Sequence, residues 1–191
     1  MMRVILASKS PRRAELLRLM GIDKFDIIPA VGAEDSGGKC DPAEMTEALA
    51  ENKALEVAAK CGADDVIIAA DTLVFLDGRV LGKPRGEDDA FNMLKALSGR
   101  GHSVYTGLCV ICGDKKIVTH EKTEVFFRAL DDAEIRRYIV SGEPMDKAGA
   151  YGAQGLGSVF VERICGDFFN VMGLPVCRLY TLLRDNTNLF R

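Results

Sequence analysis

The sequence has little of what would direct a protein to nucleic acid, to a membrane or out of the cell. Lys and Arg number 25 against 28 Asp and Glu, which gives a net charge of −3, and aromatic residues make up 7%. A general nucleic-acid binder needs a basic, aromatic-studded surface. No apolar run approaches the roughly 20 residues that span a bilayer, and the apolar run after Arg3 is too short for a signal peptide. We therefore expect a cytoplasmic protein with no nucleic-acid partner and no membrane association.

Histidine and paired cysteine, common ligands of structural metals, are also scarce. His102 and His120 are solitary, and the six cysteines are scattered except for Cys109 and Cys112. This pair lies in a predicted strand, where residues three apart point to opposite faces, and no second pair accompanies it. We interpret Cys109 and Cys112 as packed thiols and neither as metal ligands nor as a redox pair.

The order of local patterns indicates the fold class. A chain of 191 residues with 48% apolar content has ample material for a core, and we expect a single domain over residues 1–191. Strand and helix signals alternate, as in α/β proteins, and hairpin signals crowd the middle of the chain. We expect a mixed, strongly twisted sheet flanked by helices. The predicted strands are 4–7, 25–28, 66–70, 73–76, 80–81, 102–112, 116–127 and 158–164. The predicted helices are 11–20, 42–60, 87–97, 132–141 and 175–184, and Asp41 suits the N-cap of the second.

The segment after the first predicted strand carries the strongest local signal. Ser10 suits the N-cap of a helix and Pro11 its first position, which places Arg12 and Arg13 in the first turn. Unpaired backbone N–H groups and the helix dipole already favour anions there. Two cations in this turn indicate a bound polyphosphate. The alternative is a capped helix with solvated arginines, and the segment alone does not decide between them.

Two carboxylates are candidates for the chemistry. Asp71 follows the continuous apolar run 66–70, and ligands of α/β sheets bind beyond the carboxyl ends of strands. There it could hold a divalent cation or orient a water molecule, or it could make a local turn. Glu34, in the polar loop 32–39, could complete a cation site with Asp71 or be solvated.

Three further side chains are ambiguous by themselves. Lys83 lies between glycine and proline and suits either a phosphate or a surface turn. Lys53 falls near the apolar stripe of the second predicted helix, where it enters a site or extends to water. Gln154, in a glycine-rich segment, offers both donor and acceptor to a base edge, although such glycines can also be purely structural.

Several short motifs occur in a fixed order along the whole chain. They comprise the segments 8–17, 51–54, 70–74, 82–84, 97–100, 143–151, 154–155 and 171–175. In that order they resemble the signatures of the Maf family of nucleoside triphosphate pyrophosphatases. The resemblance implies a fold related to that of the inosine triphosphate pyrophosphatases, with two lobes around a cleft. It also implies cleavage between the α- and β-phosphates to give a nucleoside monophosphate and pyrophosphate.

The resemblance also implies roles for individual residues. The catalytic residues would be Asp71, Lys53 and Lys83, with Asp71 as proton acceptor or as the carboxylate that organises a metal. A divalent cation, Mg²⁺ or Mn²⁺, would be held by Asp71 and Glu34. The phosphate-binding residues that we assign are Ser8, Ser10, Arg12 and Arg13.

The same resemblance indicates the substrate. Arg12, Thr72 and Gln154 stand where the family's dTTP/UTP branch has its specificity residues, which favours this branch over the one acting on 7-methyl-GTP. The expected partners are a pyrimidine nucleoside triphosphate, canonical or modified, and a second copy in a homodimer. The alternative is a non-catalytic nucleotide sensor in cell division. A sensor needs the anion-binding groups but not an opposing carboxylate, so Asp71 beside Lys83 favours the enzyme.

Overall fold

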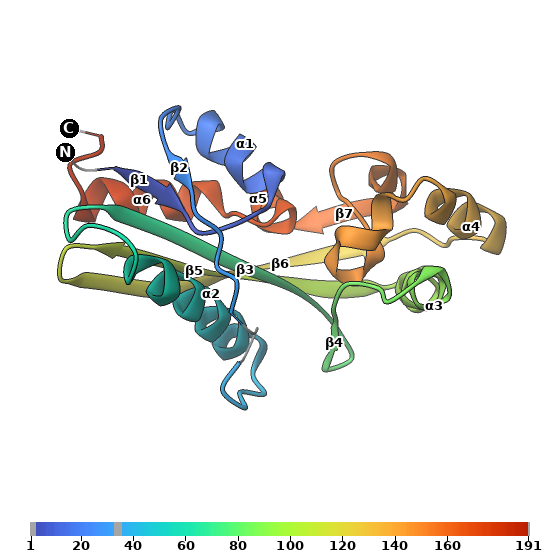
Figure 1. Cartoon of the computed structure of the whole chain (residues 1–191). Helices are drawn as coiled ribbons and strands as arrows, with labels where there is room; N and C mark the ends of the chain where they lie inside the picture. The colour runs from blue at the N-terminus through green and yellow to red at the C-terminus, as the bar shows by residue number, and fades with distance from the viewer. Residues whose placement is uncertain (1–2, 33–35, 191) are drawn as a thin grey trace. The chain divides into compact units, whose positions relative to one another are not determined.

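The computed structural model describes residues 3–32 and 36–190, and within them the chain forms one mixed, twisted sheet with α-helices and short 3₁₀ helices (Figure 1). The strands are β1 (Val4–Leu6), β2 (Asp26–Ile27), β3 (Val66–Leu76), β4 (Arg79–Leu81), β5 (Gly101–Cys112), β6 (Lys115–Phe127) and β7 (Val161–Cys165). The helices are α1 (Pro11–Leu19), α2 (Pro42–Ala58), α3 (Glu87–Leu97), α4 (Asp132–Val140), α5 (Phe168–Met172) and α6 (Val176–Asn186). The 3₁₀ helices are η1 (Glu143–Asp146), η2 (Ala148–Ala150) and η3 (Leu156–Phe160).

The sheet mixes parallel and antiparallel pairs, as the sequence predicts. Its strand order is β2-β1-β3-β5-β6-β7, with β4 paired to β3. Strand β1 is parallel to both β2 and β3, whereas the β3–β4 and β6–β7 pairs are antiparallel. The long strands β5 and β6 are neighbours joined by the turn at Gly113 and Asp114, where the sequence predicts a hairpin.

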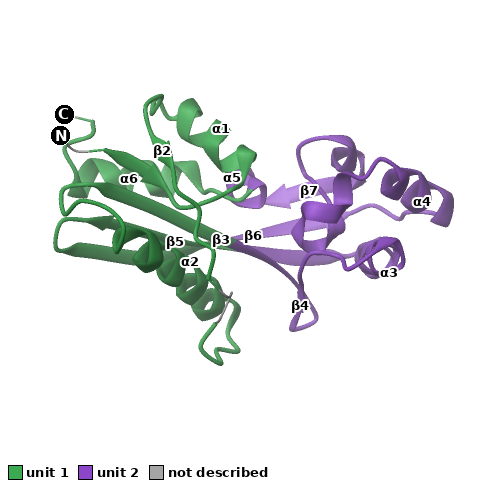
Figure 2. Cartoon of the chain, in the orientation of Figure 1, with its two compact units in different colours: residues 1–71, 106–121, 173–191 green, residues 72–105, 122–172 purple. Residues whose placement is uncertain are grey.

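The chain divides into two compact units, each discontinuous in sequence (Figure 2). The first comprises residues 1–71, 106–121 and 173–191, and the second comprises residues 72–105 and 122–172. Strands β3, β5 and β6 contribute residues to both units. The division gives two lobes, while the cleft and the single domain over residues 1–191 stay predictions.

Helix α2 packs on one face of the strands of the first unit. Alternate residues of a strand share a face, and Ile5, Ile67 and Ala69 join Ala50 and Val57 of α2 in one buried cluster. The Asp41 side chain caps this helix by accepting hydrogen bonds from the backbone N–H groups of Ala43 and Glu44 at 2.9 and 3.1 Å, as predicted.

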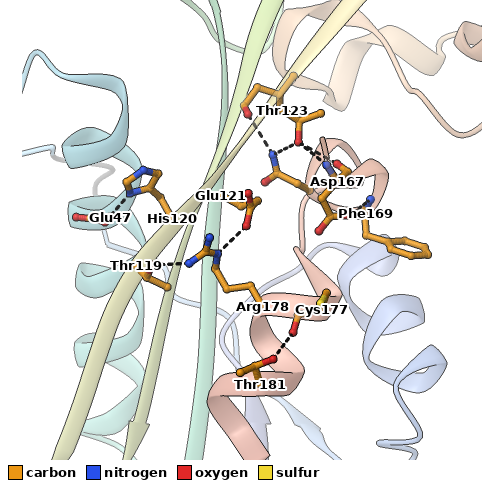
Figure 3. A network of polar contacts seen from close by, with 12 residues as sticks. Glu47, Thr119, His120, Glu121, Thr123, Asp167, Phe169, Cys177, Arg178 and Thr181 are labelled. Atoms are coloured by element: carbon orange, nitrogen blue, oxygen red, sulfur yellow. Dashed lines mark hydrogen bonds and ion pairs between the residues drawn. The ribbon is translucent and has the colours of Figure 1, made fainter. Parts of the chain in front are cut away.

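Helix α6 covers the opposite face of the same unit. His120 and Glu121 are neighbours on β6 and therefore point to opposite faces. His120 Nδ1 lies 2.7 Å from Glu47 Oε1 of α2, whereas Glu121 accepts a hydrogen bond of 2.6 Å from Arg178 Nε of α6 (Figure 3). Strand β6 thus lies between α2 and α6, and the central strand β3 is buried on both faces over residues 66–71.

The core of the second unit forms around an aromatic cluster. Phe127 of β6 packs edge-on against His102 of β5 and Tyr151, with ring centroids 5.1 and 4.7 Å apart. Tyr138 of α4 meets Phe160 in the same way at 5.0 Å. Buried apolar residues of α3 and α4 complete this core: Ala90, Leu94, Leu97, Ile135 and Ile139.

Three local predictions were wrong. Strand β3 does not stop at residue 70 but continues to Leu76. It includes the polar residues Asp71 and Thr72, at which the sequence predicts the end of the strand. Residues 156–160 form a 3₁₀ helix in place of the first half of a predicted strand, because pairing with β6 begins only at Val161. The short helix α5 was not predicted at all.

Candidate functional site

The turn from β1 into α1 is organised by its own side chains. Ser10 caps the helix by accepting from the Arg13 backbone N–H at 3.5 Å, as predicted. Ser8, which is buried, accepts from the Ser10 backbone N–H at 3.1 Å. These contacts fix both hydroxyls at the start of α1, where the helix dipole favours an anion.

The two arginines of this turn differ in their surroundings. Arg13 donates from Nη1 to Ser8 Oγ at 3.2 Å and from Nε to the Gly173 carbonyl at 2.7 Å. Its guanidinium therefore ties β1 and α1 to the segment that precedes α6. Arg12 is half-buried in the same first turn of α1.

Lys53 of α2 forms an ion pair with Asp71 of β3. The contact follows from two periodicities: Asp71 extends the row of residues 67 and 69 toward α2, and Lys53 lies on the helix face of Ala50 and Ala54. The Asp71 side chain is 9% exposed and that of Lys53 is 20% exposed. The sequence left open whether Lys53 enters a site, and the structure shows that it meets the candidate carboxylate.

Asp71 is not at the end of its strand, as the sequence suggested, but lies within β3. The parallel β1–β3 pairing ends earlier, at Leu6 opposite Ile68, with one further hydrogen bond of 2.8 Å from the Ala7 N–H to the Ile68 carbonyl. Asp71 therefore lies just beyond the carboxyl end of the parallel region, which is the position typical of ligand sites in α/β sheets. It is also the last residue of its segment in the first unit.

Glu56 of α2 holds the backbone that leads toward Glu34. Its carboxylate accepts hydrogen bonds from the N–H groups of Val31 at 3.1 Å and Gly32 at 2.9 Å, and pairs with Lys60 at 2.9 Å. The hydrogen bond from Lys60, followed by those from the two backbone groups, lowers the pKa of Glu56 to about 2. Glu34 itself lies outside the described residues.

The remaining predicted residues belong to the second unit. Thr72 directly follows Asp71 on β3, and Lys83 is exposed after β4. The Gly82 carbonyl accepts a hydrogen bond of 3.0 Å from the Gly149 N–H, which joins the segment of Lys83 to η2. Gln154 is exposed between η2 and η3.

His102 and Tyr151 form a buried pair that the sequence analysis did not find. His102 Nε2 lies 2.8 Å from the Tyr151 hydroxyl, and His102 is 3% exposed. Burial lowers the pKa of His102 to about 4. Tyr151 belongs to the glycine-rich segment, so this pair anchors that segment to β5.

The buried histidine predicts a dependence of stability on pH. The unfolded chain binds a proton at His102 near pH 6.5, whereas the folded protein binds it near pH 4, so stability falls as the pH drops through this window. We expect the free energy of unfolding to fall by about 1–2 kcal/mol between pH 6.5 and 5 from this group.

Urea unfolding at several pH values measures this slope. The variant His102→Gln keeps a polar group beside Tyr151 and should lose the slope above pH 5. Carboxylates such as Asp65, whose pKa is lowered to about 2 mainly by the hydrogen bond from Arg3, titrate below this window. An equal slope in the wild type and in His102→Gln would contradict the assignment.

The described part of the chain contains neither a preformed metal cluster nor a disulfide. Residues 3–32 and 36–190 contain no group of three or more His, Cys, Asp or Glu side chains gathered to hold a metal. The six cysteines are free, and burial raises the pKa of Cys109 to about 12, which makes it inert at neutral pH. None of the described helices is long and apolar enough to cross a membrane.

Comparisons with known proteins show the family and the fold of the chain. Residues 3–186 match the family model described as Maf-like protein. The chain is 54% identical over 185 residues to the dTTP/UTP pyrophosphatase of Aquifex aeolicus, covering 96% of this chain and 95% of the relative. It is 50% identical over 187 residues to that of Clostridium perfringens strain SM101, with 96% and 97% covered. A HAM1 protein from Coxiella burnetii shares the fold, at 16% identity and a TM-score of 0.54 over 97% of this chain and all of that one. The chain belongs to the Maf-like protein family.

Proposed function

We propose that this protein hydrolyses dTTP and UTP, and related modified pyrimidine nucleotides, to the nucleoside monophosphate and pyrophosphate. In this way it serves as a housekeeping enzyme of the nucleotide pool. The observation that carries the proposal is the ion pair between Lys53 and the buried Asp71 just beyond the parallel strands. The curated relatives support it, since two that are named dTTP/UTP pyrophosphatases are 50% identical or more over nearly the whole chain.

Phosphate binding uses the positive groups of the first unit. Cleavage of a phosphoanhydride builds negative charge on phosphoryl oxygens, so catalysis consists mainly of positioning and electrostatic neutralisation. The hydroxyls of Ser8 and Ser10 and the guanidinium of Arg12 face this charge at the start of α1. Arg13 holds Ser8 in place through its 3.2 Å hydrogen bond and adds its own positive charge. Lys83 is a further candidate for phosphate binding, as the family resemblance implies, because lysine is a mobile point charge.

Asp71 serves as the proton acceptor. In the free protein the Lys53 ammonium neutralises it. A triphosphate offers Lys53 a second, stronger anionic partner, and this frees the carboxylate to accept a proton from the attacking water. The water oxygen bonds to the α- or the β-phosphorus as the bond from that phosphorus to the α–β bridging oxygen breaks. The phosphate group that leaves keeps the bridging oxygen and the electron pair of the broken bond.

A divalent cation fits the donors of this site. Carboxylate oxygen is the ligand type that Mg²⁺ prefers, and Mg²⁺ is commonly held by one or two carboxylates together with substrate phosphates. Asp71 and Glu34 would hold the ion, and Glu56 fixes the backbone at Val31 and Gly32, shortly before Glu34. When bound, the ion supplies neutralisation of phosphate charge and acidification of water.

We also propose that the enzyme works in the cytoplasm as a homodimer. The net charge of −3 and the lack of a membrane-spanning helix in the described residues are compatible with this setting. The family resemblance supports the dimer. Analytical ultracentrifugation should give about twice the 20.8 kDa of one chain, and a single-chain mass would reject the dimer.

A panel of nucleoside triphosphates tests the substrate. The purified protein is assayed for pyrophosphate release with canonical and modified nucleotides, each with Mg²⁺, with Mn²⁺ and with EDTA. We expect dTTP and UTP to react fastest and EDTA to stop the reaction. Turnover of purine nucleotides alone would reject the branch assignment based on Arg12, Thr72 and Gln154. Binding without turnover would favour the nucleotide sensor.

A further inference from the structure

The backbone of the segment that carries Gln154 is hydrogen-bonded to the carboxylate of Glu143. Glu143, at the start of η1, accepts hydrogen bonds at Oε1 from the Tyr138 hydroxyl at 2.9 Å and from the Gly157 N–H at 3.1 Å. At Oε2 it accepts from the Leu156 N–H at 2.9 Å. The Tyr138 hydroxyl in turn accepts from the Gly152 N–H at 3.1 Å. The backbone is therefore held on both sides of Gln154 by one Glu143–Tyr138 unit.

Glycine makes this close approach possible. A Cβ atom at residue 152 would lie 2.9 Å from Glu143 Oε1, and one at residue 155 would lie 2.7 Å from Oε2. Gly155 also has a φ of +121°, which disfavours other residues. A Cβ at residue 157 would lie 2.8 Å from the Tyr138 hydroxyl. The three glycines and the carboxylate form one interlocked unit.

The carboxylate is charged in this setting. Burial raises the pKa of Glu143, but the hydrogen bonds from Leu156, Gly157 and Tyr138 outweigh it and leave the pKa below its usual value. An ionised carboxylate is acceptor-only and matches donors from three sides. Glutamine cannot replace it fully, because its NH₂ group would face another N–H or O–H donor.

We propose that Glu143 is a positioning residue for base selection, because it fixes the backbone from which Gln154 presents its amide to the base. The proposal rests on the proposed function. A glutamine amide offers one acceptor and one donor group, so its ability to separate uracil from cytosine depends on where its backbone places it relative to the base. Loosening the segment therefore lowers discrimination between the bases more than it lowers turnover.

The test is the ratio of kcat/KM for UTP to that for CTP. We expect Glu143→Gln to lower this ratio about tenfold, the scale of one net hydrogen bond. Tyr138→Phe removes the hydroxyl that links Glu143 to the Gly152 backbone, and it should also lower the ratio. This second variant tests the proposal even if Glu143→Gln does not fold. Glu162→Gln, an exposed carboxylate of β7 in the same unit, serves as the matched control and should leave the ratio unchanged.

A double variant separates positioning from general damage. If Glu143 acts through Gln154, then Glu143→Gln lowers the ratio no further in a Gln154→Ala background. Equal losses of kcat/KM for both nucleotides, or independent effects of the two substitutions on the ratio, would overturn the proposal. If instead the proposed function were wrong, the wild-type protein would turn over neither UTP nor dTTP, which distinguishes that result from a failure of the positioning role.

Discussion

Replacing Asp71 by asparagine is expected to lower kcat for dTTP at least about 100-fold, the usual scale of losing a general base, and to leave the fold intact. Asparagine has the same shape and keeps an oxygen that accepts from Lys53. It cannot take a proton from water at neutral pH and is a weaker cation ligand. Because the Lys53 side chain is 20% exposed, its ammonium can be hydrated in the variant and does not unfold the protein.

Pyrophosphate release measures the rate, and circular dichroism with urea unfolding checks the fold. Asp114→Asn is the matched control, because this aspartate is exposed in the β5–β6 turn. We expect the control to keep wild-type activity. If folded Asp71→Asn retained near wild-type turnover, Asp71 would not be the proton acceptor.

Replacing Gly107 by alanine is expected to destabilise the protein by about 3 kcal/mol or more, at the upper end of overpacking effects. Gly107 lies on β5 directly under α2. A Cβ there would stand 2.1 Å from the Thr46 carbonyl oxygen and 2.7 Å from the Glu47 backbone nitrogen. Backbone atoms cannot rotate away as a side chain can, so α2 would have to move as a whole. Lys53 is on the same helix and would move with it, so activity should fall too.

The midpoint of urea unfolding measures this loss. Gly86→Ala is the matched control, because a Cβ at residue 86 meets no atom within 4 Å and its φ of 175° is extended backbone. We expect the control to stay within about 0.5 kcal/mol of the wild type. Equal midpoints for Gly107→Ala and the wild type would show that α2 does not approach β5 as described.

Local chemistry made much of the fold predictable from the sequence. Ser10 and Asp41 were predicted as helix caps from residue type and spacing, and both side chains cap as expected. The apolar run 66–70 predicted a strand buried on both faces, and residues 66–70 of β3 are all buried. Strand–helix alternation with hairpin signals in the middle predicted the mixed sheet.

Contacts between distant segments were not predictable in the same way. The apolar strand pattern is interrupted at Asp71 and Thr72, yet β3 continues to Leu76. It can continue past the end of β1 because it also pairs with β5 and β4. The helical wheel did not decide the direction of Lys53, since its partner lies 18 residues away on a strand. Glu143 belongs to one of the motif segments but was given no role from the sequence, although the glycines at residues 152, 155 and 157 were a signal that some group approaches that backbone closely.

The identity of the products shows which phosphoanhydride bond the protein cleaves. We expect the positive groups at the start of α1 and the Lys53–Asp71 pair to serve cleavage between the α- and β-phosphates. Purified protein is incubated with dTTP and Mg²⁺ or Mn²⁺, and the nucleotides and phosphates are separated and quantified over time. We predict dTMP and pyrophosphate in equal amounts from the first time point, with no dTDP intermediate. Release of dTDP and orthophosphate, or tight binding of dTTP with no product, would contradict the account.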